Sequence, residues 1–144
     1  MIRELNVLEC RIYSSSATGT GGIVGYVSGG VLGCSFNGTV EADAGSAGGI
    51  AGNNWGGIDN CSVFGEIRGS GVNGAYGDSL SASFGTGGIT GDNSGTVSGC
   101  INDAKVSTDS DFYNLGGISG YNQGLIQSCG NFADMNGGGG VDNN

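Results

Sequence analysis

The sequence predicts an all-β fold, a β-solenoid (β-helix) of about four and a half stacked coils with one loop insertion. Two observations indicate this. A Gly-Gly-Ile segment recurs four times, and after each copy a Cys follows at one fixed distance. Behind each Cys, apolar or small residues alternate with mostly polar ones, which is the period of a half-buried strand. A fixed repeat built from short strands is typical of a solenoid.

The Gly-Gly-Ile segments define the repeat. In each, the second Gly lies 12 positions before the Cys, as from Gly22 to Cys34, and a Val or Ile lies three positions before that Cys. We expect two or three short strands in each coil, one of them starting at the Ile of the segment and one following the Cys. The four segments are Gly21-Gly22-Ile23, Gly48-Gly49-Ile50, Gly87-Gly88-Ile89 and Gly116-Gly117-Ile118.

A further half coil is expected at the start of the chain. Val7 lies three positions before Cys10 and Ile12 two positions after it, which is the spacing of Val31, Cys34 and Phe36. All five cysteines are therefore expected in one inward-facing column of the core, namely Cys10, Cys34, Cys61, Cys100 and Cys129.

One domain over residues 1–136 accounts for the repeats. The second and third segments start 39 residues apart, against 27 and 29 for the other intervals, so an insertion is expected at about 69–86. Residues 137–144 are expected to form a flexible Gly/Asn tail.

The repeated segments resemble the GLUG motif over residues 5 to 135. They read Gly22-Ile23-Val24-Gly25, Gly49-Ile50-Ala51-Gly52, Gly88-Ile89-Thr90-Gly91 and Gly117-Ile118-Ser119-Gly120, each followed by Val or Ile and then Cys. GLUG repeats occur in bacterial secreted or wall-attached proteins, including adhesin-like proteins and non-catalytic regions of immunoglobulin A specific metallopeptidases. The resemblance implies an extracellular or bacterial cell-surface module with a structural or adhesive role, whose export signal lies outside this chain. The zinc motif of those peptidases is absent.

Composition excludes several functions. The 144 residues contain no His, so neither a Ser-His-Asp triad nor an HExxH zinc site can form. The net charge is −9, and the four cationic residues are scattered, which disfavours nucleic acid as a partner. No apolar run approaches the ~18 residues of a membrane span, so no membrane insertion is expected.

The expected cysteine column has three interpretations. Buried free thiols are favoured, because Cys is among the most buried residue types and the count is odd. Disulfides between adjacent coils would need a dihedral angle that parallel stacked side chains do not provide. A metal site is disfavoured because a straight row of thiols is not tetrahedral. Asn102 and Asn131 fall on the same inward face and are expected to form an amide ladder or to bond a corner carbonyl.

Outward aromatic residues are the candidate ligand-binding residues. The position three after each Cys reads Tyr13, Asn37, Phe64, Asp103 and Phe132, and we expect it to face solvent. Flat platforms for sugar rings or for an apolar patch of a host protein are expected from Tyr26, Trp55, Phe64, Tyr121 and Phe132. In the alternative interpretation, the insertion covers Phe64 and Trp55 with Val72, Tyr76, Leu80 and Phe84.

The remaining candidates are carboxylates. Asp109 and Asp111, with loop carbonyls, are weak candidates for a structural calcium site, and no other cofactor is expected. Asp92 and Asp103 would serve the alternative of a polysaccharide-active enzyme, although no pair across a groove is evident. The favoured function is a non-enzymatic rigid spacer that presents loops and aromatic residues to a glycan or host protein. Bare terminal coils leave a further alternative, a filament subunit that associates end to end or continues in a longer chain.

Overall fold

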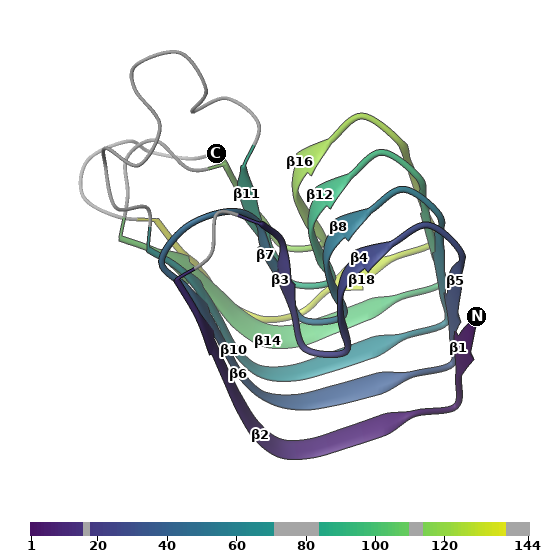
Figure 1. Cartoon of the computed structure of the whole chain (residues 1–144), viewed down its shortest axis with the longest axis horizontal. Helices are drawn as coiled ribbons and strands as arrows, with labels where there is room; N and C mark the ends of the chain where they lie inside the picture. Colours follow the sequence, from purple (N-terminus) through teal and green to yellow (C-terminus); the bar gives the residue numbers. More distant parts are fainter. Residues whose placement is uncertain (16–17, 71–83, 110–113, 138–144) are drawn as a thin grey trace.

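The computed structural model describes residues 1–15, 18–70, 84–109 and 114–137. It confirms the predicted β-solenoid: the described residues form stacked parallel strands and no helix. Successive coils follow the same path, from purple at the N-terminus to yellow (Figure 1). Within the described ranges, no helix is long and apolar enough to cross a bilayer.

Four parallel sheets run along the solenoid in this part of the chain. Sheet A contains β1 (Ile2–Arg3), β5 (Gly30–Leu32), β9 (Gly57–Asp59), β13 (Thr96–Ser98) and β17 (Leu125–Gln127). Sheet B contains β2 (Asn6–Ser14), β6 (Ser35–Ala42), β10 (Ser62–Gly69), β14 (Ile101–Thr108), β18 (Gly130–Asn131) and β19 (Met135–Asn136). Sheet C contains β3 (Thr20–Gly21), β7 (Ala47–Gly48), β11 (Gly85–Gly87) and β15 (Asn114–Gly116). Sheet D contains β4 (Val24–Val27), β8 (Ala51–Asn54), β12 (Thr90–Asn93) and β16 (Ser119–Asn122).

Each complete coil contributes one strand to every sheet, in the order C, D, A, B. The expectation of two or three strands per coil was therefore too low. The Gly-Gly-Ile segment does not start a strand at its Ile. In the second coil, β7 ends at Gly48, Gly49 and Ile50 form a corner, and β8 begins at Ala51. Strand β8 thus corresponds to the expected strand, and β7, before the corner, was not expected.

Both glycines of this corner are required by close packing. A Cβ at Gly48 would lie 2.1 Å from the carbonyl oxygen of Ala51, three residues on. A Cβ at Gly49 would lie 2.3 Å from Cγ1 of Val63 in β10. In the other coils the second glycine meets the residue at the same position of sheet B, namely Phe36, Asn102 or Asn131. The corner therefore contacts sheet B directly and fills the core.

The third glycine of the motif lets two sheets meet backbone to backbone. A Cβ at Gly52 in β8 would lie 2.3 Å from the amide nitrogen of Thr20 in β3. Gly91 and Gly120 approach residues of sheet C in the same way. Sheets C and D therefore pack without side chains between them at this position, which explains the Gly in every copy of the motif.

A left-handed residue stands at the same turn in each coil, and in four of the five it directly precedes the cysteine. Backbone φ lies between 52 and 61° at Glu4, Gly33, Asn60, Gly99 and Ser128. This conformation turns the chain from sheet A into sheet B. Glu4 precedes Leu5 rather than a cysteine, which already indicates that the first coil has a different register.

The predicted insertion lies between β10 and β11, which end and begin at Gly69 and Gly85. Its Val72, Tyr76 and Leu80 lie outside the described residues, as do residues 138–144 of the predicted tail. The expected covering of the aromatic residues by the insertion therefore stays a prediction.

Replacing Gly49 by Ala should lower the free energy of unfolding by about 2 to 3 kcal/mol, because the new methyl group overlaps Val63 and the Gly88 carbonyl. Gly57→Ala is the matched control, since a Cβ there meets no atom within 4 Å, and its effect should stay within about 0.5 kcal/mol. Urea unfolding followed by circular dichroism measures both. Equal unfolding midpoints for the two variants would contradict the packing of the corner.

Candidate functional site

Four of the five cysteines lie in one column at the start of sheet B. Cys34, Cys61 and Cys100 are buried, and Cys129 is half-buried in the last described coil. All five cysteines are free thiols. The backbone N–H of each of the first three donates to Sγ of the cysteine in the next coil, with a nitrogen–sulfur distance of 3.4 Å in every case.

The thiols satisfy the backbone N–H groups of the cysteines, which lie outside the strands at the turn from sheet A into sheet B. Each Sγ also bonds the carbonyl oxygen two residues before it, as Cys61 does with Asp59 at 3.3 Å. The pKa of the Cys100 thiol is raised because it shares a hydrogen bond with Cys61 and because burial penalises the thiolate. A protonated, buried thiol is a poor nucleophile. The burial and the repeated bonds of the column therefore support a packing role.

Cys10 does not belong to this column, and its predicted place was wrong. Strand β2 pairs with β6 in a register that aligns Val7 with Phe36, and Cys10 with Gly38. Leu5 occupies the position of the other cysteines, since its carbonyl accepts the N–H of Ser35. A bulge at Glu9, whose φ is 53°, shifts the register.

Two amide ladders run inside the solenoid. The expected ladder of Asn102 and Asn131 is confirmed, with a nitrogen–oxygen distance of 2.7 Å. A second ladder joins Asn54, Asn93 and Asn122 through two bonds of 2.7 Å. The sequence reasoning missed it, although an Asn stands four positions after the Ile in three of the four repeats. Both ladders satisfy buried polar groups and give the core a polar stripe.

Of the predicted ligand-binding residues, Tyr26 and Trp55 come together. Their ring centroids are 6.3 Å apart and their planes are inclined by 36°. Tyr26 is 54% exposed and Trp55 62% exposed. Both lie at the end of sheet D that turns into sheet A. Tyr121 shares the register position of Tyr26 three coils further on, beyond Asn53 and Asp92, and its hydroxyl accepts a bond from Gln123.

Phe64 and Phe132 lie elsewhere, on the outward face of sheet B. The predicted column is correct for Asn37, Phe64 and Asp103, but Tyr13 does not belong to it. The Glu9 bulge places Leu8 opposite Asn37 and Tyr13 opposite Glu41. The Tyr13 hydroxyl instead donates to the carboxylate of Asp43. Of the five predicted aromatic residues, Tyr26 and Trp55 thus form one close pair, and the other three lie apart from it.

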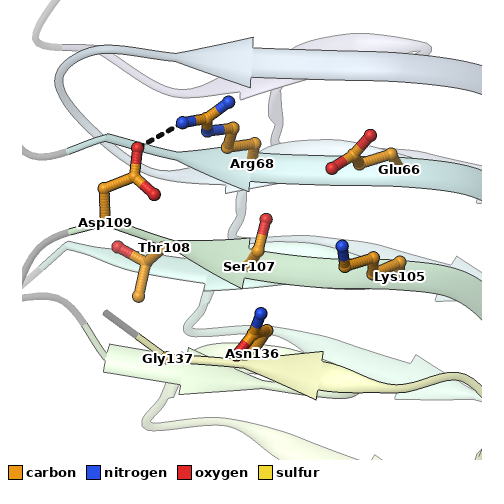
Figure 2. A pocket seen from close by; sticks show the side chains of 8 residues that line it. All are labelled: Glu66, Arg68, Lys105, Ser107, Thr108, Asp109, Asn136 and Gly137. Carbon is orange, nitrogen blue, oxygen red and sulfur yellow. Dashed lines mark hydrogen bonds and ion pairs between the residues drawn. The ribbon is translucent and has the colours of Figure 1, made fainter. Parts of the chain in front are cut away.

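A polar depression of about 320 Å³ crosses β10, β14 and β19 on the same face (Figure 2). Arg68 and Lys105, two of the four cationic residues of the chain, line it together with Glu66 and Asp109. The guanidinium of Arg68 pairs with the carboxylate of Asp109. Asp109 is therefore engaged by a cation, and Asp111, its predicted companion in a calcium site, lies outside the described residues. Calcium binding stays a prediction.

Asp92 is the one described carboxylate whose burial raises its pKa. Its Oδ1 is buried and has no hydrogen-bond partner. Asn53 and Tyr121 flank it in the register of sheet D. Asp103, its predicted partner in catalysis, is exposed on sheet B, so the two carboxylates belong to different sheets. In the described ranges no three acidic or thiol side chains gather in a metal-binding group.

Comparison with protein families matches residues 43–68 to the GLUG motif. This range covers one coil, from β7 to the penultimate residue of β10. No curated protein and no solved structure matches the chain.

Asp92→Asn should raise the free energy of unfolding by about 1 kcal/mol at pH 7, because it removes a charge from a buried oxygen without a partner. A raised pKa in the folded protein means that the stability of the native chain falls as pH rises through that pKa. The advantage of the variant should therefore vanish near pH 3, where Asp92 is protonated in both states. Urea unfolding at both pH values tests this, and a pH-independent difference between variant and wild type would contradict it.

Proposed function

We propose that this chain, a GLUG-motif repeat protein, is a non-enzymatic structural and adhesion module that binds a glycan through Tyr26 and Trp55. It would act as a rigid spacer in a secreted or surface-attached bacterial protein. The GLUG motif is a non-catalytic repeat, and the solenoid suits a spacer because the complete coils are bonded to one another along four sheets.

The observation that carries the proposal is the exposed aromatic pair. The two rings are inclined by 36° to each other, and each residue is more than half exposed. Pyranose rings present C–H groups that stack on such faces, and indole and phenol side chains add hydrogen-bonding edges. The net charge of −9 favours a neutral glycan over an acidic one.

A host protein is a less suitable partner for this patch. Specific protein interfaces bury about 800 Å² on each partner, and two rings supply only part of that area. Catalysis also has less support than binding, since Asp92 and Asp103 lie on different sheets and leave no carboxylate pair across a groove.

Trp55→Ala should lower the affinity for the bound glycan by at least about tenfold, because half of the stacking platform is removed. A glycan array with the wild-type chain identifies the ligand, and calorimetry then measures both proteins. Phe64→Ala is the matched control, since it removes an exposed ring from sheet B and should leave binding unchanged. Wild-type binding to no glycan, or equal losses in both variants, would overturn glycan recognition by this pair and leave only the spacer role.

A further inference from the structure

The strands of sheets A and B at the two ends of the solenoid have one free edge each. In the described part of the chain, β1 and β2 pair only with β5 and β6, while β17, β18 and β19 pair only with β13 and β14. A free strand edge is a template for a further strand. Because all the strands are parallel, the two edges are different and complementary: one can continue the other.

The side chains at the two edges match when the register is extended by one coil. Leu125 ends the column that begins at Met1, and Phe132 ends the column that begins at Leu8. These four side chains are large, apolar and exposed, with Phe132 at 74% and Leu8 at 67%. In the same extended register, Ile126 of one copy lies next to Ile2 of a second copy, and Met135 lies next to Ile12. Exposed apolar side chains are therefore concentrated where a second copy would cover them.

The backbone bonds extend in the same register. At the corner before each cysteine, the N–H of one coil donates to the carbonyl of the next, as Asn60 does to Ser98 and Gly99 to Gln127. The next donor in this series is the N–H of Ser128, and the matching acceptor is the Arg3 carbonyl of a second copy. In the opposite direction the N–H of Gly130 donates to the Cys100 carbonyl. The continuing pair is the N–H of Asn6 and the Cys129 carbonyl.

Charges at the junction are also compatible. The column of Arg11, Thr39, Glu66 and Lys105 ends at Asp134, so a second copy brings Arg11 next to Asp134. The net charge of −9 on each copy opposes association at long range. Physiological salt screens this repulsion between charges that are more than about 8 Å apart.

We propose that the chain associates head to tail with a second copy of itself, with β17 pairing with β1 of the next copy and β18 and β19 pairing with β2. Sheets C and D contain four described strands each and have no described strand in the first coil, which consists of β1 and β2. Sheets A and B therefore carry the contact. Such a contact is heterologous, and it adds further copies into an open row rather than closing as a dimer. It is independent of glycan binding.

Sedimentation velocity at physiological salt tests the proposal with two end variants, Leu8→Glu and Phe132→Glu. The wild-type chain should form species that grow over a roughly hundredfold range of concentration. Each end variant alone should stay monomeric, because one of its two edges carries a charge on an apolar position. An equimolar mixture should form a species of two chains and nothing larger, because each variant supplies the edge that the other has lost.

Phe64→Glu is the matched control. Phe64 stands in the same column of sheet B, between the two end positions, and should leave association unchanged. Circular dichroism shows that each variant is folded. A wild-type chain that stays monomeric throughout, an end variant that associates alone, a mixture without a two-chain species, or an equal effect of Phe64→Glu would each overturn the proposal.

Discussion

The contact between the Gly-Gly corner and sheet B is the constraint on which the rest of the structure depends. In each complete coil the second glycine lies against the side chain two positions after the cysteine, so close that a Cβ could not be added. The contact brings sheets C and D to the middle of the coil, where they pack on each other through Gly52 and its equivalents. Because the corner itself fills part of the core, Phe36 is the largest fully buried side chain of the described residues, and the others are mainly Ile and Val.

The turn into sheet B leaves the backbone N–H of each cysteine outside the strands, and the thiol column satisfies it. The cysteine thiol accepts the N–H of the preceding coil and bonds a carbonyl of its own coil. It is small enough for the core and polar enough for the bond. Asn54 does the same at the turn after sheet D, where its amide bonds both Asn93 and the carbonyl of Thr96. These columns repeat because successive coils repeat the same turns.

Much of this architecture was predictable because the chain segment from the corner to the cysteine has one length in all four repeats. Constant length implies constant path, so the solenoid and the inward face followed from spacing alone. The first coil could not be placed in this way. Ile2, Leu5 and Val7 have the same spacing as Val7, Cys10 and Ile12, and only pairing of β2 with β6 selects the first set. The bulge at Glu9 could not be predicted from the sequence, because exposed, charged residues also occur at regular strand positions. Tyr26 and Trp55 were predicted as outward aromatic residues, but their direct contact was not, because they occupy different positions in successive repeats and meet only through the stacking of the coils.

The corner links the fold to the proposed roles, since it sets the position of sheet D and thereby the turn that exposes Tyr26 and Trp55. The most direct test of the corner is a nuclear Overhauser experiment on the isotope-labelled chain. Cross-peaks between the α-protons of Gly49 and the methyl protons of Val63 are expected, because these groups are in van der Waals contact. Their absence from a folded sample with assigned resonances would contradict the account, since the corner would then lie away from sheet B.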